Sequence, residues 1–312
     1  MSYRGVVAVL LVASSLWVAC GSDNPTATET PSVDSGLPDG TAVPEAAVES
    51  GTDAASDASD APTDGPAGTI GAGPYSIAYS AGPGIGIDNR PSVAAVVNAN
   101  GSLESYDAAV NEKPTRGTNQ VSDVHADAFS LIGRWNGGTS AGTYFTSSPF
   151  TWSATEGFHY GVVIASGALP TSGMVTYTPV AATSATIDDG SLAVGTISAK
   201  TSVLFQAGGR KTGIEVTITM PGDATYTATT TGGIADPSQS TLGSFNNSFN
   251  GDITVASAGV ACTGPIACTM SVRGYVGGGA GANAAARVIF VFVVDAGTTG
   301  KTIHGAAVLK AP

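Results

Sequence analysis

The 312 residues include 12 Lys and Arg against 24 Asp and Glu, which gives a formal net charge of −12, and charged side chains make up 12% of the chain. Binding to a phosphate backbone needs clustered Lys and Arg, so this composition argues against a nucleic-acid partner. Glycine is abundant, with 42 residues, and Leu-rich amphipathic runs are almost absent. This balance argues against a helical bundle and favours short strands joined by many turns.

Residues 1–19 predict a lipoprotein signal peptide. Arg4 is followed by an uncharged run over 5–19, which is shorter than the roughly 20 apolar residues that span a bilayer and is typical of a secretory leader. We expect Cys20, the next residue, to carry the lipid and become the new N-terminus. Trp17 stands where such leaders usually have Leu. The alternative is an ordinary secreted or periplasmic protein in which Cys20 is incidental.

Residues 20–72 are expected to form a disordered acidic stalk rich in Pro, Ser, Thr and Ala. Ten of the 24 acids lie between 21 and 66, where there is no Lys or Arg. Such a segment cannot bury enough apolar surface to offset the cost of ordering. Its charge therefore describes a solvated tail more than a binding face. The stalk implies a membrane partner through the lipid on Cys20, and Gly21 after the cysteine suits transfer to a bacterial outer membrane.

From residue 73 onward the pattern changes to short alternating runs separated by Gly, Asn and Pro. A hairpin is predicted around Asn100-Gly101, and a strand over 158–165 places Phe158 and Tyr160 on one face. Arg287–Asp295 is apolar on both faces, which predicts a strand covered on both sides. The predicted strands are 92–97, 102–106, 126–135, 158–165, 174–180, 191–197, 202–206, 213–220, 223–230, 252–256, 269–275, 287–295 and 302–310.

This regular spacing predicts an all-β fold, an antiparallel barrel of about 8–10 strands. The expected β-barrel domain is 73–312, with its core at about 125–310. The alternative is a membrane-spanning barrel, which needs aromatic girdles and an outward apolar band on every strand. Aromatic residues are 7% of the chain and scattered, and most strands place Thr and Ser outward. We therefore expect a tethered barrel that does not span the membrane.

Four short motifs in the C-terminal part carry a family resemblance. They are Gly-Arg-Trp at 133–135, Leu-Pro-Thr-Ser-Gly at 169–173, Gly-Tyr-Val-Gly at 274–277 and Gly-Ala-Ala at 305–307. In this order they resemble the eight-stranded β-barrel domain of transferrin-binding-protein-like bacterial surface lipoproteins. The resemblance covers about residues 125–310 and implies that barrel fold. Because the motifs consist of turn and packing residues, they imply no catalytic or ligand-binding set.

Cys262 and Cys268 are six positions apart, and in an exported protein they are most simply a disulfide that closes a short loop. Zinc is the alternative, but it needs two further ligands, and His125, His159 and His304 lie far apart in the sequence. His159 is expected on the face opposite Phe158 and Tyr160, toward solvent. No metal site and no cofactor are predicted.

The remaining candidates for chemistry are weak. The Gly-rich stretch 277–281 has no Lys and no helix to follow it, so phosphate binding is not expected. Asp188-Asp189-Gly190 is typical of a turn, while Asp107 and Glu112 are loop acids without a visible partner. No nucleophile elbow, a Gly-x-Ser-x-Gly serine held in a sharp turn between a strand and a helix, is predicted. The sequence therefore predicts no catalytic residue and a protein that is not an enzyme.

Three functions stay open. The first is a lipid-anchored envelope module that binds a protein or small molecule, whose ligand-binding residues the sequence does not identify. The second is a structural or adhesive envelope protein without a ligand cavity, and the third is an enzyme of unknown reaction. The first two differ in the barrel interior, because a ligand binder needs a cavity and a structural module is filled by side chains.

Overall fold

The computed structural model describes residues 68–82, 87–107, 112–143, 149–263, 267–295 and 300–312. The predicted signal peptide, Cys20 and most of the predicted stalk lie outside these residues. Within the described part, helix is limited to the short 3-10 turns η1 (Pro237–Gln239), η2 (Val260–Cys262) and η3 (Gly281–Asn283). None of these helices is long or apolar enough to cross a membrane.

The N-terminal half of the described chain forms an antiparallel sheet of eight strands, here called the accessory sheet, in the order β5-β6-β10-β1-β2-β3-β4-β8. A separate two-stranded ribbon joins β7 to β9. The strands are β1 (Tyr75–Ala81), β2 (Ile87–Val97), β3 (Leu103–Asp107), β4 (Lys113–Thr115), β5 (Gln120–Ala126), β6 (Ser130–Asn136), β7 (Gly138–Thr139), β8 (Ala141–Thr143), β9 (Thr151–Trp152) and β10 (Phe158–Ile164).

The C-terminal half closes into an antiparallel barrel. Its wall runs β11-β13-β14-β15-β17-β18-β19-β20, and β20 pairs again with β11. Among the described residues this gives eight barrel strands, while β12 pairs with β20 and β16 with β17 outside that ring. The strands are β11 (Gly173–Ala182), β12 (Thr186–Ile187), β13 (Thr196–Gln206), β14 (Gly209–Thr219), β15 (Thr225–Thr229), β16 (Gly243–Phe245), β17 (Ser248–Ala256), β18 (Thr269–Gly277), β19 (Arg287–Asp295) and β20 (Ile303–Lys310).

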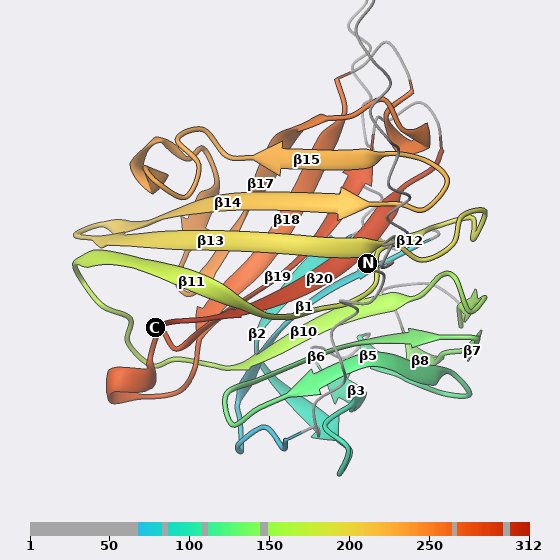
Figure 1. Ribbon diagram of the computed structural model, residues 1–312. Coiled ribbons are helices and arrows are strands. Elements are labelled where there is room, and N and C mark those ends of the chain that lie inside the picture. The colour runs from blue at the N-terminus through green and yellow to red at the C-terminus, as the bar shows by residue number, and fades with distance from the viewer. Residues whose placement is uncertain (1–67, 83–86, 108–111, 144–148, 264–266, 296–299) are drawn as a thin grey trace, which may run out of the picture. The chain divides into compact units, whose positions relative to one another are not determined.

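The predicted all-β fold and antiparallel barrel are confirmed, and Figure 1 shows the yellow-to-red barrel strands beside the blue-to-green accessory sheet. All barrel strands lie between Gly173 and Lys310. The strands from Tyr75 to Ile164, which the sequence assigned to the barrel domain 73–312, form the accessory sheet instead.

The accessory sheet packs on the outer wall of the barrel. The interface is an apolar layer in which side chains of β1, β6 and β10 meet those of β18, β19 and β20. Gly161 allows the close approach, because a Cβ there would lie 3.3 Å from Cβ of Ile289. The buried residues of this layer are Ala78, Ile132, Val163, Tyr275, Ile289, Val291, Ala306 and Val308.

Strand β19 is covered on both faces, as its apolar sequence predicts. Phe290 and Phe292 point into the barrel core, whereas Ile289 and Val291 point to the accessory sheet. A strand so placed has no solvent face, which explains why polar residues do not alternate along it. The prediction of a strand packed on two sides is therefore confirmed.

The far face of the accessory sheet has a core of its own, built around stacked aromatic rings. Trp135 and Phe158 stack with centroids 4.7 Å apart, and the indole N–H of Trp135 donates to the carbonyl of Leu103 at 2.8 Å. Gly133 is required here, because a Cβ would collide with the Tyr160 hydroxyl. The Gly-Arg-Trp motif thus serves packing, with Trp135 and Tyr160 fully buried.

Several predicted boundaries need correction. The hairpin around Gly101 is confirmed, but the strand expected over 126–135 is interrupted. There the Asp127 carboxylate accepts hydrogen bonds from the backbone N–H groups of Phe129 and Ser130, at 2.8 and 2.9 Å, and fixes a turn between β5 and β6. The strands expected over 191–197 and 202–206 are mostly one strand, β13, because Lys200 continues the ladder opposite Glu215.

Candidate functional site

A seam of buried polar groups runs between the accessory sheet and the barrel. His159 comes from β10 and His304 from β20, and both are almost completely buried. Ser80 on β1 and Arg134 on β6 approach from the same side of the accessory sheet. Buried polar groups need partners to offset the loss of water, and each of these four side chains has them.

His159 is held between two threonines of the segment that follows β11. Its Nδ1 lies 2.8 Å from Oγ1 of Thr183 and its Nε2 lies 2.7 Å from Oγ1 of Thr186. Burial lowers the pKa of His159 well below the usual value, and the nearby charge of Arg134 lowers it further. The expectation that His159 faces solvent is wrong, because the barrel covers that face of β10.

His304 connects three other side chains. Its Nδ1 lies 2.6 Å from Oγ of Ser80 and its Nε2 lies 2.8 Å from Oγ1 of Thr302, a hydroxyl that also lies 3.0 Å from a carboxylate oxygen of Asp188. Ser80 donates its single proton to the carbonyl of Phe292 at 3.0 Å, so Nδ1 of His304 is the donor to Ser80. Burial lowers the pKa of His304 to about 3.

This Ser-His-Thr-Asp chain has the residue types of a hydrolase but not the geometry. A nucleophilic serine needs access to a substrate and a base that accepts its proton. Ser80 is 0% exposed and its proton is held by a backbone carbonyl. This series of hydrogen-bonded side chains therefore positions the accessory sheet against β20 and offers no reactive group to solvent.

Arg134 provides a second fastening between the sheet and the segment after β11. Its Nε donates to Asp123 at 2.9 Å, and Asp123 also accepts hydrogen bonds from the backbone N–H and the hydroxyl of Ser184, at 2.9 and 3.0 Å. Asp123 adopts a φ of 57°, a left-handed conformation that Asp tolerates better than most residues. Arg134 in the Gly-Arg-Trp motif thus helps to hold the accessory sheet to the segment that follows β11.

The barrel interior is filled. Large apolar side chains from every wall strand meet there, with alanines between them. A filled barrel of this size leaves no room for a ligand along its axis. Among its buried members are Tyr177, Val203, Phe205, Ile214, Ile218, Tyr226, Phe249, Met270, Phe290, Phe292 and Leu309.

One end of the barrel carries the described pocket. We define the Phe245 rim as the turns at 206–209 and 245–248 together with the loops 166–172 and 278–286. Cross-links hold these segments together: Nδ2 of Asn247 donates to the carbonyl of Ser166 at 2.7 Å, and Oγ of Ser244 donates to the carbonyl of Arg210 at 3.0 Å. The N–H of Gly71 donates to the carbonyl of Ala128, the neighbour of the pocket residue Phe129, at 3.0 Å.

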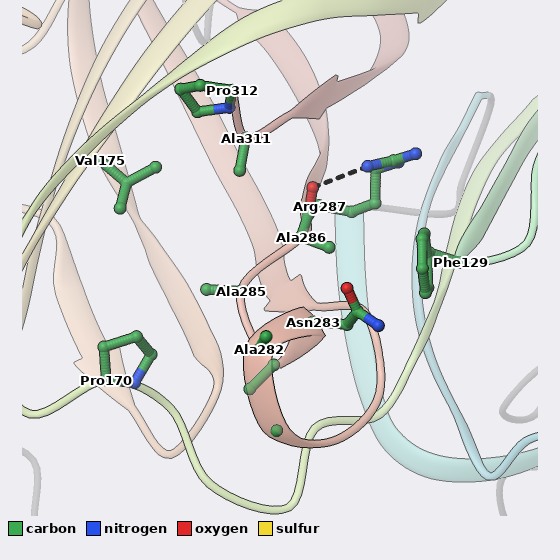
Figure 2. Close-up of a pocket in the computed structure, with 12 residues that line it drawn as sticks. Phe129, Pro170, Val175, Ala282, Asn283, Ala285, Ala286, Arg287, Ala311 and Pro312 are labelled. Carbon is green, nitrogen blue, oxygen red and sulfur yellow. Dashed lines mark hydrogen bonds between the residues drawn. The ribbon is translucent and has the colours of Figure 1, made fainter.

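The pocket at the Phe245 rim has a volume of about 390 Å³. Figure 2 shows the loop through Ala282, Ala285 and Ala286 between Val175 and Pro170 on one side and Phe129 on the other. Small apolar side chains dominate its lining, and Arg287 supplies its charged group. Arg287 is already engaged by two hydrogen bonds to Asp127, so the pocket suits apolar contact better than ion pairing.

The Phe245 rim also exposes apolar side chains. Phe245, at the tip of the β16–β17 hairpin, is 76% exposed, the highest value among large hydrophobic residues of the described chain, and Met174 at the start of β11 is 52% exposed. Phe and Met are enriched at protein interfaces relative to the rest of the surface, so these two side chains are candidate contact residues. The sequence analysis did not single out Phe245, although its setting in Gly-Ser-Phe-Asn-Asn predicts a hairpin tip.

The remaining predicted residues can now be placed. Cys262, the last residue of η2, and Cys268 form a disulfide, with Cα atoms 5.1 Å apart, at the end of the barrel opposite the Phe245 rim. Asp188 and Asp189 form the predicted turn, in which the N–H of Gly190 donates to the carbonyl of Ile187 at 3.1 Å. His125 pairs with Ile132 in the β5–β6 ladder. It is far from His159 and His304 in the sequence.

Two expectations about loop acids are wrong. Asp107 forms an ion pair with Lys113 at 2.7 Å, and Glu112 forms one with Arg90 at 2.6 Å. The Gly-rich stretch also differs from expectation, because Gly281 begins the short turn η3. Across the residues that the structure describes, no group of three or more His, Cys, Asp or Glu is arranged to hold a metal ion.

The fold and this seam define a class of protein: a closed β-barrel whose outer wall is covered by an accessory sheet. No family model and no curated protein match the sequence. Among solved structures, a mutant of transferrin-binding protein B from Haemophilus parasuis Hp5 is 11% identical, with a TM-score of 0.37, covering 76% of this chain and 44% of that one. The chain thus spans less than half the length of that protein.

Two further structures are similar at the same level. A protein described as a surface lipoprotein is 12% identical with a TM-score of 0.36, covering 76% of this chain and 98% of that one. A mutant of transferrin-binding protein B from Actinobacillus pleuropneumoniae H49 is 10% identical with a TM-score of 0.34, covering 77% of this chain and 100% of that one. At this identity the likeness transfers no function.

Proposed function

We propose that this chain is a lipid-anchored protein of the bacterial envelope that binds a partner through the Phe245 rim and has no enzymatic activity. The observation that carries the proposal is the contrast between the closed interior of the protein and its accessible rim. The barrel core is filled and the seam is closed, whereas the rim combines a pocket with the exposed ring of Phe245. The accessible binding surface is thus at the rim.

The anchor is proposed from the sequence. Cys20 follows an apolar leader and precedes an acidic stalk, and a flexible chain of about 50 residues would average roughly 40 Å end to end. Such a tether lets the barrel reach partners away from the lipid surface while remaining in the envelope. Lipid on Cys20 with more than one acyl chain would anchor firmly.

The anchor is tested by cell fractionation. The Cys20→Ala protein should move from the membrane to the soluble envelope fraction, while a Ser22→Ala control stays in the membrane. Retention of Cys20→Ala in the membrane would contradict lipid anchoring at Cys20.

The rim is tested by site-specific photocrosslinking on intact cells. A photoreactive amino acid at Phe245 should give a protein adduct of defined mass, while the same residue at Thr217, an exposed position on the wall strand β14, should give none. Equal labelling at both positions, or none at Phe245, would contradict binding through the rim. The second outcome favours the alternative of a structural envelope protein, which the filled barrel interior supports.

A further inference from the structure

The Phe245 rim has an uncharged surface with a basic border. The turns and loops that form the rim contain no Asp, Glu, Lys or Arg. Arg210 and Lys211 directly follow one of these segments, and Arg287 directly follows another. Lys310 lies opposite Arg287 in the β19–β20 ladder and is exposed. The charged side chains next to the rim in the sequence are thus all basic.

Two of these bases have no acidic partner in the described part of the chain. Arg287 is paired with Asp127 at 2.7 Å, but no carboxylate among the described residues forms an ion pair with Lys211 or Lys310. Lys211 donates instead to a neutral acceptor, the carbonyl of Ser240, at 3.0 Å. The basic border can therefore attract an acidic segment from outside the barrel.

The acidic part of the chain is joined to the protein beside this border. Residues 21–66 hold the ten acids of the predicted stalk, and the described chain begins at Gly68, whose N–H donates to the carbonyl of Ala126 at 3.0 Å. A Cβ at Gly68 would lie 3.4 Å from Cα of Asp127. Asp127 in turn accepts two hydrogen bonds from Arg287, which lines the pocket. The sequence alone predicts a solvated tail, and the structure adds a basic surface at the point where that tail ends.

The stalk contains one segment suited to the pocket. Leu37 is the one leucine in residues 21–66, which have no Ile, Met or aromatic residue, and it has Asp34 and Asp39 on either side. About 30 residues separate Leu37 from Gly68, and a random chain of that length averages roughly 30 Å end to end. A tethered segment within reach of its site has an effective concentration in the millimolar range. Weak contacts are then enough for occupancy.

We propose that the segment 33–39 of the stalk covers the Phe245 rim as an intramolecular competitor of the partner. Leu37 occupies the pocket, whose small apolar side chains leave about 390 Å³ for it. The carboxylates beside Leu37 lie toward Lys211 and Lys310. This inference rests on the proposed function of the rim, because the partner must displace the segment in order to bind. A second copy of the chain fits less well, since it would bring the same bases face to face.

The test is photocrosslinking of the purified full chain at low concentration, without any partner. A photoreactive amino acid in place of Leu37 should give an adduct that keeps the mass of one chain. Digestion with trypsin and mass spectrometry should join position 37 to the peptide 274–287, which contains the pocket loop. An adduct of twice the mass would identify a second copy as the occupant and overturn the proposal.

The same photoreactive residue at Val48 is the matched control for position. Val48 is closer to Gly68 along the chain than Leu37 is, so crosslinking that merely followed chain proximity would be stronger at Val48. Docking of Leu37 predicts the opposite order. Equal or stronger crosslinking from Val48 to the peptide 274–287, or none from Leu37, would overturn the proposal.

Charge variants of the full chain test the basic border. Asp34→Asn combined with Asp39→Asn should lower the yield from position 37 by about fivefold, the effect expected of losing two exposed ion pairs. Asp57→Asn combined with Asp60→Asn removes the same charge elsewhere in the stalk and should leave the yield unchanged. Equal yields from the two double variants would contradict docking at the basic border.

The stalk proposal and the proposed function can fail separately. Partner adducts on cells from Phe245 without an intramolecular adduct from Leu37 would overturn the stalk proposal alone. An intramolecular adduct from Leu37 without any partner adduct on cells would overturn partner binding while leaving the segment 33–39 on the rim. If both proposals hold, the Asp34→Asn and Asp39→Asn double variant should give more partner adduct at Phe245 than wild type.

Discussion

The imidazole rings of His159 and His304 lie 6.5 Å apart and 12° from parallel. One ring belongs to the accessory sheet and the other to the barrel wall, so the pair sits at the joint between the two parts of the fold. Burial lowers the pKa of both rings, that of His304 to about 3. Both are therefore neutral in the folded protein at neutral pH.

The two buried histidines predict that the protein loses stability in mild acid, at pH values above those at which carboxylates titrate. An unfolded histidine has a pKa of about 6.5, so below that pH the unfolded chain binds protons that the folded chain does not. The free energy of unfolding therefore falls as pH falls, by about 1.4 kcal/mol per pH unit for each histidine. Urea unfolding at several pH values between 5 and 6.5 measures this slope. A flat free energy over that interval would contradict the assignment.

The ion pair between Asp127 and Arg287 links the β5–β6 turn to the start of β19. Nε and Nη2 of Arg287 donate to Asp127 at 2.8 and 2.7 Å. Burial raises the pKa of Asp127, but the Phe129 N–H and Arg287 outweigh it, and the pKa is lower than usual. Asp127→Asn should therefore cost about 1–3 kcal/mol in the free energy of unfolding.

The pair between Asp107 and Lys113 is the matched control. Its side chains are 51% and 54% exposed, and exposed ion pairs contribute little. Asp107→Asn should change the free energy of unfolding by less than about 0.5 kcal/mol in the same urea titration. Equal effects of the two substitutions would show that Asp127 does not fasten the barrel to the sheet.

Gly305, in the Gly-Ala-Ala motif, is expected to tolerate no side chain. A Cβ there would lie 2.5 Å from Cδ1 of Ile197 and from Cζ of Phe292, inside the barrel. Gly305→Ala should cost about 1–3 kcal/mol, because overpacking forces the core to shift. Gly167→Ala is the control, since no atom lies within 4 Å of its added Cβ, and its midpoint of thermal unfolding should stay close to wild type.

The disulfide between Cys262 and Cys268 closes a short loop next to the barrel core. The double substitution of both residues by Ser should lower the free energy of unfolding by about 2 kcal/mol on the chain-entropy account. Cys268 is 6% exposed and packs in the core, so burial of a Ser hydroxyl adds to the loss. Thiol labelling of unfolded, unreduced wild type should find neither cysteine reactive, and labelling of either would contradict the bond.

Sequence patterns predicted features that depend on neighbours along the chain. The alternation around Tyr160, the turn at Gly190 and the two-sided strand Arg287–Asp295 were all read correctly, because each follows from local periodicity or turn chemistry. The break at Asp127 was missed, since its carboxylate caps the turn through backbone N–H groups that composition does not reveal.

The seam could not be predicted in the same way. Ser80 and His304 are 224 positions apart, and nothing near either residue indicates the other. His159 was placed on the correct face of its strand, but the barrel that covers this face begins at Gly173 and has no local signature in β10.

The outward faces of β19 and β20 are covered by strands made much earlier in the chain. Ala78 on β1 shares a buried cluster with Val291 on β19 and Val308 on β20, the last two strands of the barrel. Its face of the accessory sheet can therefore be buried only after those two strands have been synthesised. Contacts this distant in sequence slow folding, and apolar strands left uncovered in the meantime promote aggregation. A chain shortened before β19 should therefore neither close its barrel nor keep its accessory sheet in solution, which makes complete synthesis a condition for folding of either part.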